Sequence, residues 1–197
     1  MSLRLDKAVA DLKMIMVEDA IDVRNGLPLS LFKFASSLSP IPNVDLFVVD
    51  SHNRFLLAWR DDEYYGQGWH IPGGCIRLLE SLETRIQKTA IDELGENVIY
   101  DKTPLMIVEA LASEERIRRQ GNFERTHNIC ILYKCRFSKK YDIEVYNRGK
   151  EIYQKGYLKW FDQVPENFLH AQIPIYRKFL ENWVRTNYEC NAEFTII

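Results

Sequence analysis

A glycine-rich turn that runs into an acidic helix constrains the fold of this chain more than any other feature. Residues 72–74 are Pro-Gly-Gly, and they end a short apolar segment, residues 68–72, that is typical of a β-strand. Neither glycine carries a Cβ atom, so the backbone here can approach a ligand or a metal ion closely. The chain is therefore expected to place a strand, a close-approach turn and a helix next to one another.

The helix after this turn is predicted to cover residues 81–94. Ser81 is a suitable N-cap, and Gly95 can adopt the left-handed conformation that ends many helices. The helical repeat puts a broad apolar face on one side, made of Leu82, Ile86, Ala90, Ile91 and Leu94. We expect this face to pack against the strands.

Glu93 points into the same arc of the helix as its apolar residues. A carboxylate directed at a core is costly unless an opposite charge compensates it. That charge can come from Arg85 or Lys88 on the same helix, or from a bound divalent cation. Helix geometry leaves these alternatives open, and the two glycines of the preceding turn favour the cation.

The rest of the chain alternates between helical and strand patterns. Hydrophobic periodicity predicts helices at 4–24, 28–38 and 173–186, and strands at 44–50, 54–60, 68–72, 104–117, 126–137 and 156–162. The first two strands are separated by Ser-His-Asn and are expected to form a β-hairpin. Strands dominate the middle of the chain, with one helix inserted among them and one at the end. This order predicts an α+β sandwich with a mixed sheet, not a regular β-α-β array.

Composition narrows the classes of function. The formal net charge is −2 and no long run of Lys or Arg occurs, which argues against nucleic acid as a partner. No apolar run is long enough to span a membrane and no signal-peptide pattern is present, so a soluble cytoplasmic protein is expected. The four cysteines show no metal-binding spacing, and they are interpreted as reduced thiols of an intracellular protein.

The segment from residue 74 to residue 96 resembles the Nudix box, G-x5-E-x7-R-E-U-x-E-E-x-G-U, in which U is a bulky aliphatic residue. The lead-in at residues 69–74, W-x-I/V-P-G-G, is also typical of Nudix proteins. The motif positions that match are Gly74, Glu80, Glu93 and Gly95. Lys88 replaces the Arg of the motif, Thr89 replaces the first Glu of its acidic cluster, and Asp92 replaces the next Glu.

These departures are similar to those of one branch of the family, the GDP-mannose mannosyl hydrolases. That branch also lacks the first Glu of the cluster and keeps the last, and the resemblance extends over residues 28–185. It implies a Nudix-type α/β/α sandwich at 28–197, preceded by a helical extension at 1–27. It also implies a homodimer, because dimers are common in the family.

The resemblance implies a Mg²⁺ site, with Mn²⁺ as an alternative cation. Its protein ligands would be the backbone carbonyl of Gly73, the carboxylate of Glu93 and the side-chain amide of Gln154. Mg²⁺ prefers oxygen ligands and is often held by one carboxylate together with substrate phosphates. The implied substrate is a small-molecule nucleotide sugar similar to GDP-mannose, split into a nucleoside diphosphate and a sugar.

The resemblance also implies roles for other residues around the substrate. Asp45 and Arg60 would assist the leaving group or shape the nucleotide pocket, and Lys88 and Gly74 would contact the substrate. Lys155 stands where the branch has a general-base His. A lysine is normally protonated at neutral pH, so a structural or phosphate-contacting role for Lys155 is favoured over that of a base.

Two alternatives to sugar release remain open. In the first, water attacks phosphorus, as in most Nudix enzymes, in another nucleoside diphosphate compound. In the second, the domain is catalytically weak and binds a nucleotide sugar as a sensor. The missing acidic residue and the missing His favour binding alone, whereas the retained metal ligands favour catalysis.

Overall fold

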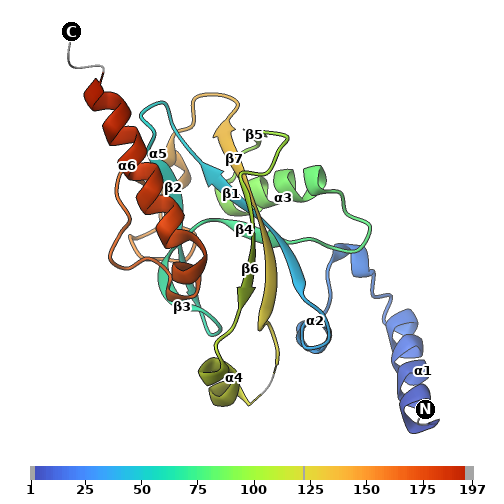
Figure 1. Ribbon diagram of the computed structural model, residues 1–197. Coiled ribbons are helices and arrows are strands. Elements are labelled where there is room, and N and C mark those ends of the chain that lie inside the picture. Colours follow the sequence, from blue (N-terminus) through green and yellow to red (C-terminus); the bar gives the residue numbers. More distant parts are fainter. Residues whose placement is uncertain (1–2, 122, 194–197) are drawn as a thin grey trace.

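The computed structural model describes residues 3–121 and 123–193, which form two β-sheets flanked by helices (Figure 1). The larger sheet has the strand order β4 (Gly73–Cys75), β1 (Ile41–Val48), β7 (His127–Phe137), β5 (Val98–Tyr100), and β6 (Met106–Leu111) also pairs with β7. The smaller sheet has the order β3 (Gly66–His70), β2 (Phe55–Asp62), β8 (Leu158–Phe161). Because β1 is parallel to β7 and antiparallel to β4, the sheet is mixed, as predicted.

Helices cover the sheets from two sides, which confirms the predicted α+β sandwich. Strand β1 alternates between the two cores: Leu46 belongs to the cluster with Ile86 of α3 (Leu82–Leu94), and Phe47 belongs to the cluster with Leu180 of α6 (Lys178–Glu193). Two short helical turns, η2 (His170–Gln172) and η3 (Ile173–Arg177), lead into α6. The four-residue helix α5 (Ile143–Tyr146) lies beside the first cluster.

Helix α3 has the predicted ends, but its buried face is rotated. The Ser81 hydroxyl accepts a hydrogen bond from the Thr84 amide at 3.1 Å, and Gly95 ends the helix with φ of 72°. Of the expected apolar face, Ile86, Ala90 and Leu94 are buried, whereas Leu82 and Ile91 are exposed. The polar side chains of Arg85 and Thr89 are buried in their place, because this side of α3 faces the Pro-Gly-Gly turn and its loop.

The predicted hairpin of residues 44–50 and 54–60 is wrong. Strands β1 and β2 belong to different sheets and are joined only by the isolated bridge between Val49 and Phe55. The connecting turn is hairpin-like, since Asp50 accepts hydrogen bonds from the His52 and Arg54 amides. Strand β1 nevertheless has apolar side chains on both faces and lies between β4 and β7, so its partners are distant in sequence.

The segment 104–117 is a strand only in its first half. Strand β6 ends at Leu111, and helix α4 (Glu114–Gln120) follows at once. The Ser113 hydroxyl caps α4 by accepting from the Arg116 amide at 3.2 Å, and Gly121 ends it with φ of 66°. The cap and the two acidic residues in the first turn favour a helix from residue 114, so the predicted strand does not continue to residue 117. Strand β5 was not predicted from the sequence.

The N-terminal segment contains α1 (Leu3–Glu18), the 3₁₀ turn η1 (Val23–Asn25) and α2 (Leu29–Ser36). Helix α1 is shorter than the predicted 4–24 and stands away from the sheets in Figure 1. None of its residues is buried, and its apolar stripe is open, with Leu5 60% and Val9 44% exposed. Leu5 and Val9 are therefore open to solvent, whereas Leu12 and Met16 of the same apolar stripe are half-buried.

Two further expectations concern membranes and cysteines. No helix within the described ranges has both the length and the hydropathy needed to cross a membrane. Cys75, Cys130 and Cys135 are free thiols, as predicted, and the side chain of Cys190 lies outside the part that the structure describes.

Candidate active site

Three predicted site residues from the glycine turn and α3, Gly73, Gly74 and Glu93, share one cavity. Gly73 and Gly74 of β4 line a space of about 630 Å³ together with Asp92 and Glu93 of α3. The opposite wall comes from the N-terminal segment, including residues of α2. The segment predicted to be an extension, with its neighbour α2, therefore helps to form this cavity.

The two glycines are required by packing on both sides. A Cβ atom on Gly73 would lie 1.8 Å from Oδ1 of Asp45, and one on Gly74 would lie 2.6 Å from Oγ1 of Thr89. Contacts this short are not tolerated, so β4 runs closer to β1 and α3 than any residue with a side chain allows. Thr89 is buried, and its hydroxyl has no hydrogen-bond partner among the described residues.

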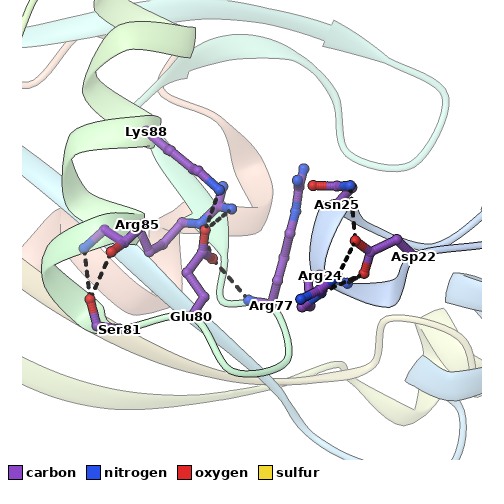
Figure 2. A network of polar contacts seen from close by, with 9 residues as sticks. Asp22, Arg24, Asn25, Arg77, Glu80, Ser81, Arg85 and Lys88 are labelled. Atoms are coloured by element: carbon purple, nitrogen blue, oxygen red, sulfur yellow. Dashed lines mark hydrogen bonds and ion pairs between the residues drawn. The ribbon is translucent and has the colours of Figure 1, made fainter.

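Glu80 is held by a network of cations that Figure 2 shows from close by. Arg85 donates two hydrogen bonds to the Glu80 carboxylate, from Nε to Oε2 at 2.7 Å and from Nη2 to Oε1 at 2.8 Å. Lys88 Nζ lies 3.2 Å from Oε1, and the Arg77 amide donates to Oε2 at 3.1 Å. The side chains of Glu80 and Arg85 are only 4% and 5% exposed, so this is a buried, bidentate ion pair.

The Glu80 network occupies the two side chains that were considered as structural partners of Glu93. Both candidate structural partners of Glu93, Arg85 and Lys88, bind Glu80 instead. Among the described contacts, the Glu93 carboxylate makes no hydrogen bond or ion pair, although its backbone carbonyl accepts from the Tyr146 hydroxyl at 3.0 Å. Burial raises the pKa of Glu93, and Arg60 offsets part of that rise. A half-buried carboxylate with no fixed partner is suited to a cation that arrives with the substrate.

Asp45 and Arg60 line a second cavity, of about 370 Å³, which shares the β4 backbone with the first. The Tyr176 hydroxyl donates to Oδ2 of Asp45 at 2.5 Å. Burial raises the pKa of Asp45 to about 6, although the Tyr176 hydroxyl favours the ionised form. Arg60 Nε lies 2.9 Å from Oδ2 of Asp62 and contributes positive charge to the surroundings of both Asp45 and Glu93.

Gln154 and Lys155 lie in an exposed turn. The Gln154 side-chain oxygen accepts a hydrogen bond from the Glu151 amide at 3.0 Å, which closes this turn. The turn is attached to β2 through the Gly156 amide, which donates to the Trp59 carbonyl at 2.8 Å. Lys155 is near enough to Glu93 to lower its pKa. Gly73, Glu93, Arg60 and Asp45 thus line two cavities that share the glycine turn, whereas Gln154 lines neither cavity and is engaged within its own turn.

Histidine supplies no evident base in the second cavity. The buried His70 ring donates from Nδ1 to the Ala58 carbonyl at 2.8 Å. Burial lowers the pKa of His70 to about 3, so the ring is neutral and structural. Tyr176, in contrast, was missed by sequence reasoning, because it lies 131 positions from Asp45 and no local pattern marks it.

Comparison with known structures identifies the architecture. A MutT protein from Methanosarcina mazei Go1 has a TM-score of 0.52 at 18% identity, covering 76% of this chain and 96% of that one. A NUDIX hydrolase from Nitrosomonas europaea has a TM-score of 0.52 at 12% identity, covering 77% and 73%. A UDP-X diphosphatase has a TM-score of 0.50 at 17% identity, covering 94% and 81%. The chain has the Nudix fold.

Comparison of the sequence alone finds no match: no family model and no curated protein matches the chain. Within the Nudix fold, the donor set for a metal can be judged from the residues present. The described residues contain no group of three or more His, Cys, Asp or Glu side chains placed to hold a metal ion. Glu93 and the Gly73 backbone line the same cavity, and their oxygen atoms are of the kind that a hard cation with further ligands from substrate and water would accept.

The Glu80 network makes a prediction about stability and pH. Replacing Glu80 by Gln leaves Arg85 buried without its partner, so the free energy of unfolding at pH 7 should fall by roughly 3 kcal/mol. Burial raises the pKa of Glu80, but the hydrogen bonds and charges of Arg85, Arg77 and Lys88 together outweigh this and bring it from 4.5 to about 2. Because the folded-state pKa is depressed, the stabilisation is complete above pH 4.5 and is lost as the pH falls towards about 2.

Urea unfolding of the wild type and the Glu80→Gln variant at pH 7 and pH 3 measures this. The difference between the two proteins should shrink at pH 3, and Glu83→Gln, an exposed change on the same helix, should cost under about 1 kcal/mol. A Glu80→Gln variant as stable as the wild type at pH 7 would contradict the assigned role of the ion pair.

Proposed function

We propose that this protein is a Mg²⁺-dependent hydrolase of nucleoside diphosphate compounds, with nucleoside diphosphate sugars similar to GDP-mannose as the preferred class. The observation that carries the proposal is the unpaired carboxylate of Glu93 in the cavity beside Gly73 and Gly74. Such a group is costly for a protein with no use for it. Mn²⁺ can replace Mg²⁺ at a site made of the same oxygen ligands.

Glu93 and the Gly73 carbonyl would hold the cation, and the bound metal would neutralise negative charge on the leaving diphosphate. Gln154 remains part of the proposed ligand set. Its amide oxygen would have to leave the Glu151 amide, so the exposed turn would open when substrate binds. Gly74 lets the substrate approach the β4 backbone, because no side chain stands in the way.

The cations around the cavity would act on the phosphates. Arg60 is half-buried next to Glu93 and Asp45, where its planar guanidinium can bind phosphate oxygens. The Lys88 ammonium group pairs with Glu80, so it can reach a phosphate only by leaving that carboxylate. Its side chain is 48% exposed and can move in this way. Asp45 lies beneath Gly73 and would orient the turn, with Tyr176 fixing its carboxylate. Lys155 would bind a phosphate from the exposed turn; we assign it no role as a base.

Two routes of hydrolysis give different products. Attack of water on the sugar carbon releases a nucleoside diphosphate and free sugar. Attack on phosphorus releases a nucleoside monophosphate and a sugar phosphate. Thr89 in place of a carboxylate favours the first route, since one metal suffices to stabilise a leaving diphosphate. The likeness of fold to a UDP-X diphosphatase supports the second route as an alternative.

The metal assignment predicts the effect of Glu93→Gln. The change keeps the size of the side chain and removes its charge, so kcat/KM with Mg²⁺ should fall on the order of 10³-fold. The melting temperature should be unchanged or higher, because a partly buried charge is removed. The assay measures release of nucleoside diphosphate, monophosphate and free sugar from a panel of nucleoside diphosphate sugars.

Glu83→Gln on the same helix is the matched control and should keep wild-type activity. A Glu93→Gln variant that hydrolyses the panel as fast as the wild type would remove the metal assignment. A wild type that binds these compounds with Mg²⁺ but releases no product would show that the domain is a sensor and not an enzyme.

We also propose that the protein is a homodimer joined through α1. A helix of 16 residues with no buried side chain gains little from its own propensity, and its exposed apolar stripe is suited to a second copy. Sedimentation velocity should show a dimer for the wild type and a monomer for Leu5→Lys combined with Val9→Lys. A wild type that sediments as a monomer at tens of micromolar would contradict this proposal.

A further inference from the structure

Three arginines meet around one aromatic ring at the second cavity. The guanidinium carbons of Arg60, Arg116 and Arg125 lie 5.2, 5.4 and 4.9 Å from the centroid of the Tyr65 ring. They come from three separate parts of the chain: the end of β2, helix α4, and the residue pair before β7. All four residues are half-buried and line the cavity of about 370 Å³. We call these three side chains the arginine site.

Three guanidinium groups this close repel one another, and the described ion pairs compensate only one of them. Arg60 pairs with Asp62 at 2.9 Å. No ion pair of the described residues involves Arg116 or Arg125; Arg116 donates from Nη2 to the Arg125 carbonyl at 3.5 Å. The Tyr65 ring offsets part of the repulsion through its quadrupole, but no described hydrogen bond joins its hydroxyl to the three guanidinium groups.

Arg125 is held in one position by its surroundings. Its guanidinium lies 5.3 Å from the Phe32 ring centroid and 4.9 Å from that of Tyr64. Its backbone amide donates to the buried Ser36 hydroxyl at 3.1 Å, and its φ of 54° is unusual for a residue with a side chain. The buried Arg125 Nε has no hydrogen-bond partner among the described residues. Helix α2 thus fixes a charged donor in a strained backbone position, which is typical of a functional site.

The acidic groups in the same cavity are already engaged. Glu109 lies 3.0 Å from His127 Nε2, and the Asp45 carboxylate accepts from Tyr176. The remaining polar groups include Asn43 and Asn128, whose side chains bind each other at 3.2 Å. The free donors of this cavity therefore come mainly from arginine, and a planar fork of donors matches the oxygens of a phosphate group.

We propose that Arg60, Arg116 and Arg125 form a binding site for a phosphoryl group in the second cavity, which shares the β4 backbone with the cavity of Glu93. Each guanidinium donates to the phosphate oxygens, and the bound anion removes the repulsion among the three cations. The phosphoryl group belongs either to the diphosphate of the substrate or to a phosphate on its second moiety. Only this choice of source rests on the proposed function; the anion site itself does not.

Binding of inorganic pyrophosphate without divalent metal tests the site, by calorimetry at low salt in the presence of a chelator. The wild type should bind, and Arg116→Gln and Arg125→Gln should each weaken binding about tenfold or more. Arg119→Gln is the matched control, because Arg119 is on the same helix, is exposed and pairs with Glu115 at 3.7 Å. It should change the affinity by less than about twofold.

Absence of pyrophosphate binding to the wild type, or an equal loss in Arg119→Gln and Arg116→Gln, would overturn the proposal. Melting temperatures show whether each variant folds, and Arg125→Lys, which keeps the charge but loses the planar fork, replaces Arg125→Gln if that variant does not. A loss of affinity for a nucleoside diphosphate in the variants identifies the diphosphate as the source. A loss only for a sugar phosphate identifies the second moiety. A protein that binds pyrophosphate but hydrolyses nothing would retain the arginine site and reject the proposed function.

Discussion

The buried ion pair of Glu80 and Arg85 is the interaction on which the rest of the site depends. It ties the loop after β4 to the first turns of α3, and it does so with two short hydrogen bonds in a space that water does not reach. With the loop fixed, Gly73 and Gly74 lie between Asp45 on one side and Thr89 on the other. The close approach of β4 to β1 and α3 follows from this arrangement.

The same ion pair determines the character of Glu93. Arg85 and Lys88 are the two cations of α3 that helix geometry offers to Glu93, and both are used by Glu80. Glu93 therefore faces the cavity without a fixed partner, and burial raises its pKa. The Glu80 carboxylate is thus neutralised by protein cations and serves the fold, whereas the Glu93 carboxylate has no ion-pair partner among the described residues, which is why we propose it as a metal ligand.

The sequence predicted the parts of the fold that depend on neighbours along the chain. The ends of α3 follow from Ser81 and Gly95, and the mixed sandwich follows from the order of strands and helices. The prediction that β1 and β2 form a hairpin was wrong. Which strands pair depends on the sheet into which each strand packs, and the local sequence does not contain that information. The buried face of α3 was rotated because Arg85 and Thr89 are buried by contacts with the glycine turn, which periodicity alone does not contain.

In the candidate site, too, the features that are local in the sequence were predicted and the contacts between distant segments were not. The local motif identified Gly73, Gly74 and Glu93, and the structure brings these together with Arg60 and Asp45. The motif gave no indication that the Tyr176 hydroxyl donates a hydrogen bond to Asp45, because that contact joins the two ends of the domain. Arg116 and Arg125 were equally hidden, since the segment that carries Arg116 was predicted to be a strand and is a helix.

The most direct test of this account is a crystal structure with Mn²⁺ and a nucleoside diphosphate, in which anomalous scattering locates the metal. The account predicts one Mn²⁺ between Glu93 and the Gly73 carbonyl, in contact with the diphosphate, while Glu80 stays bound to Arg85. A metal bound elsewhere, several metals in the cavity, or a diphosphate bound away from the glycine turn would contradict it.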